Sequence, residues 1–475
     1  MAHSPANHAE HIRREALVSH LSPTYALNAG WPSQAVPLVQ GGFERPPYES
    51  TSSRWHFWLT AGLLGFLFFM TNHDILVSRL PDYAHYDDSV ISVAVGTNFI
   101  RRISFFLLAA LGIWLTCLSS RTPWRFNSWI ALPILGYVAW CCGSVLWSVE
   151  PGMGFKRVIT LVCFYLCALG IGRRFEMRDL CWLMFVIIAA YFAIGFTLEV
   201  ALGTFRPWQS GHRFAGTLHP NSQAAHLSMM CLAAFALIPS EPKRRKWLYA
   251  AVAVGLVFVA LTRSRTNLAA ALVALTAVGA LRSSVKSKLI STYLAVMAGL
   301  VGTMLLMLAG KDPLTQLYEG AMLGREDDVA SLSGRGFIWP ICWEFIGQRP
   351  WLGYGYGSFW TPSRIELFLD ELQFSMFEAH NGYLELLLGT GIIGCGLYVA
   401  SMFTSLFASA STALKTGESN YALLFGVMVF AFIYANSESG MMGVNLVTIL
   451  MTSQMLNLAL RPATARQGEP CAAIA

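Results

Sequence analysis

The feature that most constrains this chain is a series of uninterrupted apolar blocks. Each block is roughly 17 to 25 residues long, the length that a helix needs to cross about 30 Å of hydrocarbon. A soluble domain of 475 residues would need more than 13% charged residues, so the composition agrees. We predict an all-α polytopic membrane protein with about 12 transmembrane helices. They are expected near 55–72, 98–118, 128–147, 157–172, 180–201, 222–239, 247–262, 267–281, 288–309, 382–407, 420–435 and 443–460.

The loop charges indicate how these helices are oriented. The positive-inside rule places short loops rich in Lys and Arg in the cytoplasm. If the N-terminal tail is cytoplasmic, the basic loops at 121–125, 173–178, 243–246 and 282–288 all fall inside. The alternation then holds through every predicted helix. We therefore expect a multi-pass protein of the bacterial inner membrane, with both termini cytoplasmic and the functional face toward the periplasm.

The chain divides into three parts. Residues 1–54 are polar and lack the apolar core of a signal peptide, which predicts a disordered cytoplasmic tail. Residues 55–460 form the integral membrane domain, and 461–475 form a second cytoplasmic tail. The one long connection, 310–380, separates the ninth and tenth predicted helices. Its amphipathic stretch at 337–346 and its Gly-Tyr-Gly-Tyr-Gly run at 353–357 favour a small helical cap on the outer membrane surface.

Several function classes are disfavoured. The ten cysteines lie mostly inside apolar segments, so we expect no disulfide, no metal site and no cofactor. The glycine run follows no strand and lacks the Lys and Ser of a phosphate-binding loop. The net charge of +6 is dispersed, which argues against nucleic acid as a partner. A transporter would need ionisable residues at mid-membrane, where the predicted helices are nearly free of charge.

Five arginines fall on the predicted outer side, against the usual charge bias. A planar guanidinium that is always charged suits bidentate recognition of phosphate. Taken together, these arginines favour a receptor for a lipid-linked pyrophosphate. The alternative is that each one pairs with lipid headgroups or with neighbouring carboxylates. The five are Arg206, Arg213, Arg263, Arg265 and Arg335.

His380 immediately precedes the tenth predicted helix. An imidazole with its ordinary pKa of about 6.5 is neutral at pH 7 and can accept a proton from a hydroxyl. A structural role is the alternative for a loop histidine. Asn381 and Glu385 are four residues apart and share a helix face. Glu385 either orients His380 or caps the start of the helix, and the sequence leaves both open.

These motifs resemble the O-antigen ligase and O-unit polymerase superfamily of membrane glycosyltransferases, and within it the polymerases of bacterial exopolysaccharide production. The resemblance runs from about 147 to 394. Its most specific parts are GRGFIWPICWEFIGQRPWLGYGYGSFW at 334–360 and AHNGYLELLLGTGIIG at 379–394. Weaker pieces are LWSVEP at 146–151, HRFAGTLHPN at 212–221 and LTRSRT at 261–266. The polar tail has no counterpart in the family pattern, and the modest length of the loop favours a polymerase over a ligase.

The resemblance implies a metal-independent enzyme that polymerises undecaprenyl-pyrophosphate-linked oligosaccharide repeats at the periplasmic side of the bilayer. By motif, Arg213, Arg265 and Arg335 would bind the pyrophosphate, and His380 would activate the acceptor hydroxyl. A flippase and a chain-length regulator of the same pathway are the candidate protein partners. The alternative is an O-antigen ligase that transfers finished glycan to lipid A-core.

The long loop also offers aromatic faces that could stack on sugar rings along a growing chain. The alternative for them is an aromatic belt at the level of the lipid headgroups. They are Trp351, Tyr354, Tyr356, Phe359 and Trp360, of which Tyr354 and Trp360 are counted with the supporting site residues.

Overall fold

The computed structural model describes residues 54–73, 99–118, 126–209, 211–284, 297, 335–372 and 378–460. Helices are the regular elements of these ranges, and no residue in them lies in a strand. The predicted all-α class is therefore confirmed. Apart from Met297, the predicted ninth helix at 288–309 lies outside the described residues, as do the tail before Arg54 and the tail at 461–475.

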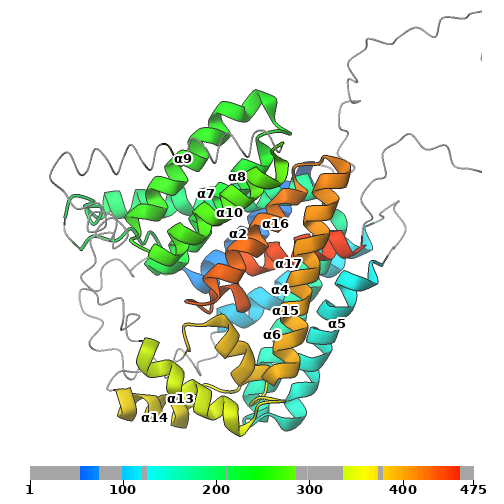
Figure 1. Ribbon diagram of the computed structural model, residues 1–475, viewed down its shortest axis with the longest axis vertical. Coiled ribbons are helices and arrows are strands. Elements are labelled where there is room, and N and C mark those ends of the chain that lie inside the picture. The colour runs from blue at the N-terminus through cyan, green and yellow to red at the C-terminus, as the bar shows by residue number, and fades with distance from the viewer. Residues whose placement is uncertain are drawn as a thin grey trace, which may run out of the picture. The chain divides into compact units, whose positions relative to one another are not determined.

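Helices occupy eleven of the twelve predicted segments, with bounds close to those expected (Figure 1). By length and composition, five stretches are long and apolar enough to cross a membrane: α4, α5 with η4 (Ser144–Trp147), α6, α7 and α15. The count of twelve spans stays a prediction. The helices are α2 (Arg54–Asn72), α4 (Phe99–Cys117), α5 (Ser128–Gly143), α6 (Pro151–Arg174), α7 (Met177–Ala201), α8 (Pro220–Leu237), α9 (Arg245–Leu261), α10 (Arg265–Arg282), α15 (Gly382–Thr416), α16 (Tyr421–Tyr434) and α17 (Leu446–Leu460).

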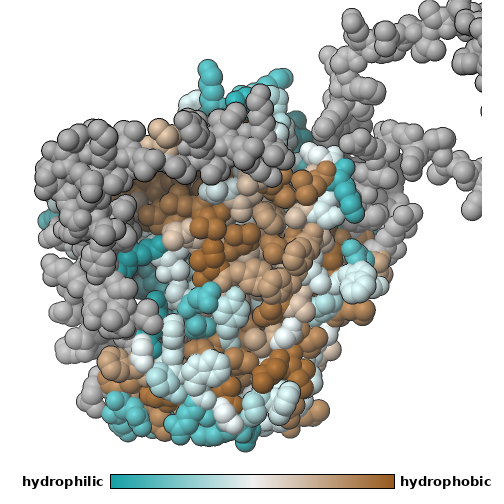
Figure 2. Space-filling view, in the orientation of Figure 1, coloured by the Kyte–Doolittle hydropathy of each residue, from teal (hydrophilic) through white to brown (hydrophobic). Residues whose placement is uncertain are grey.

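The surface of these helices suits lipid better than water. Figure 2 shows hydrophobic residues over the middle of the visible face and hydrophilic residues toward its upper and lower edges. Large apolar side chains point outward, among them Trp129 at 83%, Phe407 at 68% and Phe106 at 59% exposure. An exposed apolar surface of this extent would be a liability in water, so it indicates a face that contacts hydrocarbon.

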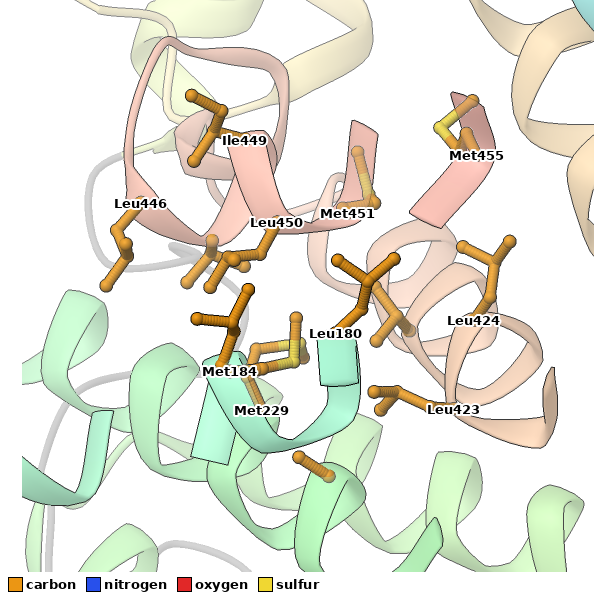
Figure 3. Packing of buried hydrophobic residues seen from close by; sticks show 14 of the residues in the cluster. Leu180, Met184, Met229, Leu423, Leu424, Leu446, Ile449, Leu450, Met451 and Met455 are labelled. Carbon is orange, nitrogen blue, oxygen red and sulfur yellow. The ribbon is translucent and has the colours of Figure 1, made fainter. Parts of the chain in front are cut away.

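The core of the helical body lies where α7, α8, α16 and α17 meet. Figure 3 shows Leu180 and Met184 of α7 packed with Met229 of α8, Leu424 of α16 and Leu450 of α17. Every residue of α17 is buried. Its few polar side chains are buried with it, and Asn457 Nδ2 donates to the Gly172 and Phe175 carbonyls at 2.8 Å. The helix is therefore wrapped by other helices on every side.

The helix pair α4 and α6 packs closely along its length. The approach is tightest at Gly112 and Gly170, where a Cβ on Gly170 would overlap the backbone of Gly112. Small residues allow helix backbones to come this close. The N-terminal ends of the two helices also meet, because Arg101 and Arg157 interact electrostatically there. The two helices are therefore parallel.

Contacts between distant segments join loops that are predicted to lie on the same side of the membrane. At the predicted cytoplasmic ends, Arg178 forms an ion pair with Glu241. The Asn127 amide donates to the Ala459 carbonyl at 2.8 Å. Each partner comes from a segment expected on the same side of the membrane, so these contacts agree with the alternation read from the loop charges.

Two short helices cap the opposite end. They are α13 (Arg335–Gln348), which covers the predicted amphipathic stretch, and α14 (Pro362–Leu372), both at the lower edge of Figure 1. Ile338 of α13 and Phe368 of α14 share a separate apolar cluster with Leu384 and Leu388 of α15. This second cluster attaches the cap to the first turns of α15.

The helix α15 is broken at Gly391. That residue has φ 65° and ψ −172°, a conformation outside the helical region. The expected bond from Ile392 to Leu388 is replaced by two bonds to the cap: the Ile392 amide donates to Pro350, and Leu388 accepts from the Tyr354 amide, both at 2.8 Å. A Cβ on Gly391 would overlap the Trp351 carbonyl. The break therefore serves as the docking point of the cap loop.

We expect Gly391→Ala to destabilise the protein by roughly 1–3 kcal/mol, because the φ and ψ of this residue are essentially restricted to glycine. Thermal unfolding of the protein purified in detergent measures the change. Gly396→Ala is the matched control, because it lies on the same helix with no atom within 4 Å of an added Cβ. Equal melting temperatures for the two variants would contradict the assignment of Gly391 as a docking point.

Candidate functional site

A carboxylate in the turn between α16 and α17 links three segments far apart in the sequence. Glu438 Oε1 accepts from Asn221 Nδ2 at 2.6 Å and from Arg335 Nη2 at 2.7 Å. Arg213 Nη2 in turn donates to Asn221 Oδ1 at 2.8 Å. The side chains of Glu438 and Arg335 are only 12% and 18% exposed, so the interaction is largely shielded from water. Of the three predicted phosphate-binding arginines, Arg335 thus contacts this carboxylate directly and Arg213 is connected to it through Asn221.

His380 lies in the same cluster. Its Nδ1 is 3.1 Å from Glu378 Oε1 and 3.7 Å from Glu438 Oε2. The backbone of His380 has φ 47°, in the left-handed region that residues other than glycine seldom adopt. Such strained residues persist only where their surroundings hold them, and they gather at functional sites. The structure therefore brings His380 together with Arg213 and Arg335.

The charges around His380 alter its protonation. Burial lowers the pKa of His380, but the adjacent Glu378 and Glu438 carboxylates outweigh it and raise the pKa to about 9. For Glu378, burial raises the pKa, but His380 and the nearby cations outweigh it and lower the pKa below its ordinary value. At pH 7 the pair is an imidazolium and a carboxylate. The expectation of an ordinary histidine pKa is wrong, because the sequence did not reveal the two carboxylates.

The loop that carries Arg213 is held from two sides. Arg213 Nε donates to the Thr262 carbonyl at 3.0 Å, which joins this loop to the turn before α10. The buried Glu199 of α7 accepts from the backbone amides of Ala215 and Gly216 at 2.9 Å and 2.7 Å. A carboxylate that accepts two amides fixes the path of a loop. Arg213 is thereby aimed at Asn221.

The other outer arginines are placed differently. Arg265 is the first residue of α10, and two residues later Asn267 donates to the Asn221 carbonyl at 3.2 Å. The start of α10 therefore borders the site. Arg206 is exposed, and its Nε donates to the Gly203 carbonyl in its own turn. Arg263 has φ 53°, a second strained position on this side.

The residues around the start of α15 have separable roles. Asn381 is the N-cap, with Oδ1 accepting from the Tyr383 and Leu384 amides at 3.0 Å and 3.1 Å. Glu385 accepts from Trp360 Nε1 at 3.1 Å and from the Ala379 amide. Asn381, and not Glu385, thus caps the start of α15. Glu385 instead holds the backbone immediately before His380.

The aromatic run of the cap is mostly structural. Tyr354 and Phe359 are 3% and 2% exposed and pack within the apolar cluster of the cap. The Tyr354 hydroxyl donates to the Phe345 carbonyl at 2.9 Å. The expectation that these two rings stack on sugars is wrong, because their faces are covered by other side chains. Trp351, at 64% exposure, remains open.

Sequence reasoning missed Glu378, Glu438 and the side chain of Asn221. The N-cap of α8 is His219, whose Nδ1 accepts from the Asn221 amide, which leaves the Asn221 side chain to bridge Arg213 and Glu438. A signal was present, since Glu438 is a carboxylate in a short outer loop between two apolar helices. Carboxylates near the membrane are costly and tend to be functional.

Ligand atoms of Glu378, His380 and Glu438 lie within 4.8 Å of one another, close enough to hold a metal ion. The sequence search for ligand spacing missed this group because its members come from separate loops. In the structure the same residues form ion pairs: Arg335 and Asn221 bind Glu438 Oε1, and the raised pKa of His380 favours the imidazolium, which must lose its proton before it can bind a metal. We expect the group to serve as ion pairs.

The purified protein is accordingly expected to bind Mn²⁺ at neutral pH no more tightly than the Glu378→Gln variant. Electron paramagnetic resonance of free Mn²⁺ during a titration measures the binding. Saturable binding of one ion that is lost in Glu378→Gln would show that the three residues form a metal site.

Two comparisons with known proteins bear on this site. The model of the O-antigen ligase family matches residues 250–399, a range that contains Arg265, Arg335 and His380. The exopolysaccharide production protein ExoQ of Rhizobium meliloti (strain 1021) is 25% identical over 349 residues, which cover 70% of this chain and 78% of that protein. The resemblance to the O-antigen ligase and O-unit polymerase superfamily is confirmed.

Proposed function

We propose that this protein is a membrane glycosyltransferase that polymerises undecaprenyl-pyrophosphate-linked oligosaccharide repeats into exopolysaccharide. The observation that carries the proposal is the convergence of Arg213, Arg335 and His380 around Glu438 and Asn221. Cations suited to a pyrophosphate and a titratable base thus lie together at one end of an apolar helical body.

The arrangement fits one displacement step. The acceptor hydroxyl oxygen bonds to the anomeric carbon of the donor sugar while the bond from that carbon to the pyrophosphate oxygen breaks. His380 takes the hydroxyl proton, and the leaving pyrophosphate keeps the electron pair. Arg213, Arg265 and Arg335 stabilise the growing negative charge in place of a divalent cation. Attack from the face opposite the leaving group inverts the anomeric centre.

The proposal includes a topology of twelve spans, with both termini cytoplasmic and the site periplasmic. Its support is that every segment contributing to the site falls in an outer loop of that arrangement. The hydrogen bonds Arg213–Asn221, Asn221–Glu438 and Arg335–Glu438 join these loops to one another. A lipid-linked substrate would reach such a site from the outer leaflet.

A polymerase is favoured over a ligase by the similarity to a protein of exopolysaccharide production, which extends over most of both chains. A ligase that transfers glycan to lipid A-core is the second candidate, supported by the family model that matches the site region. The polymerase would work beside a flippase and a chain-length regulator.

The pH dependence tests the base. With His380 as the base, kcat/KM for polymerisation should rise about tenfold per pH unit below pH 9 and level off near that value, because only the neutral imidazole accepts a proton. Replacing Glu378 by Gln removes a negative charge that stabilises the imidazolium. The midpoint should therefore move to lower pH, by roughly one unit.

His380→Ala should lower the rate by roughly 10²–10⁴-fold, the usual contribution of a general base. His219→Asn is the matched control, because it removes the imidazole of the nearby histidine and keeps a side-chain acceptor at the N-cap of α8. Loss of activity in His219→Asn with retention in His380→Ala would show that His380 is not the base. An unchanged pH midpoint in Glu378→Gln would likewise show that the group titrating in the activity profile is not His380.

The products in cells separate polymerase from ligase. A strain expressing His380→Ala in place of the wild type should accumulate single repeats on the lipid carrier and secrete no polymer of high molecular weight. Mass spectrometry of extracted lipid-linked sugars gives the result. Long polymer retained on the carrier, with only its transfer to another acceptor lost, would establish the ligase and contradict polymerisation.

A further inference from the structure

A second pair of arginines lies at the predicted outer ends of α4 and α6, apart from the site around Glu438. The contact between Gly112 and Gly170 sets the register of these parallel helices. Arg101 lies 11 residues before Gly112, and Arg157 lies 13 residues before Gly170. The difference of two residues corresponds to about 3 Å along the axis. The register therefore places both guanidinium-bearing residues at nearly the same depth.

The glycine-rich loop of the cap covers this pair. Gly357 lies against the stem of Arg157, since a Cβ on Gly357 would be 2.9 Å from Arg157 Cγ. The phenol of the neighbouring Tyr356 interacts electrostatically with both Arg157 and Arg101. The Tyr356 amide donates to Ser144 Oγ at 2.9 Å, which fixes the loop on the end of α5. Arg101, Arg157 and Tyr356 are thus neighbours beneath the glycine-rich loop.

A group of tyrosines lies beside this pair. Tyr356 lines a small cavity of about 20 Å³ together with Tyr137, Tyr165 and Tyr398. A cavity of that size holds about one water molecule, so it is not a path for sugars. Met442, also in its lining, packs against Gly382, two residues after His380, and so connects the surroundings of the pair to the reacting centre.

We propose that Arg101 and Arg157 form a second pyrophosphate site, which holds the lipid-linked chain that accepts the transferred glycan. The inference rests on the proposed polymerisation. Donor and acceptor both carry a pyrophosphate in that reaction, but only the donor pyrophosphate lies at the reacting carbon. The acceptor pyrophosphate is separated from its reacting hydroxyl by the sugars of one repeat. A second anion site, built from residues other than those around Glu438, meets that requirement.

Equilibrium binding of undecaprenyl pyrophosphate to the full-length protein in maltoside detergent tests the site. The wild type should bind two molecules, and Arg101→Gln/Arg157→Gln should bind one. Arg213→Gln/Arg335→Gln should also bind one. The matched control is Arg102→Gln/Lys156→Gln, which removes the same charge from adjacent exposed positions and should still bind two. Two molecules bound to Arg101→Gln/Arg157→Gln, or one bound to the wild type, would overturn the proposal.

A phospholipid headgroup is the other source of a phosphate at this depth. Phosphatidylglycerol at the same mole fraction in the detergent should leave both molecules bound to the wild type. Displacement of the second molecule would make the pair a headgroup site and overturn the proposal. If the wild type binds two molecules of undecaprenyl pyrophosphate but forms no polymer, the second site stands and only the proposed polymerisation is contradicted.

Kinetics give an independent reading. Arg101→Gln/Arg157→Gln should raise the KM for lipid-linked repeat by about tenfold or more, since hydrogen bonds to charged groups are the strong ones. The pH midpoint of activity should stay where it is in the wild type, because His380 and its carboxylates are untouched. An unchanged KM would overturn the proposal.

Discussion

The site depends on a single shielded carboxylate. Glu438 accepts from Arg335 and Asn221 through one oxygen, and its other oxygen faces His380. Largely removed from water, such a charge is stable only with partners of opposite sign and with hydrogen bonds. Those partners come from the start of α8, the start of α13 and the residues before α15. Removing Arg335 or His380 would weaken the charge pairing of this carboxylate, and removing Asn221 would cost it a hydrogen bond, so the carboxylate holds the loops in one arrangement.

The sequence predicted well those features that depend on hydropathy or on a local motif, namely the positions of the helices and several residues of the candidate site. Eleven helices lie where the apolar blocks predicted them, and Arg213, Arg335 and His380 do share a site. Glu378 and Glu438 were missed because their importance arises only when separate loops meet. For the same reason the protonation of His380 was misjudged. Its pKa is set by groups that lie 2 and 58 residues away in the chain.

The aromatic run shows a different limit. For an aromatic residue in a loop beside a membrane, the sequence does not distinguish three roles: stacking on a sugar, lying at the level of the lipid headgroups, or packing in a small core. Packing decided the outcome, because Tyr354 and Phe359 are buried in the apolar cluster that α13 and α14 form with the start of α15. Gly353 and Gly357, both with positive φ, let the same loop turn tightly against α15 and α6. The motif is therefore largely a packing motif.

The break at Gly391 divides α15 into two mechanical parts. Before the break, Leu384 and Leu388 pack in the apolar cluster of the cap, whereas Leu386 packs in the main core and the Gly382 amide donates to the Ala435 carbonyl at the end of α16. The hydrogen bond that would continue the helix across the break is diverted to the cap loop. The segment that positions His380 is thus joined to the cap and to the end of α16, and it does not continue rigidly into the rest of α15. A tilt of α15 beyond Gly391 need not reach the histidine, whereas a movement of the cap against α16 would act on it directly.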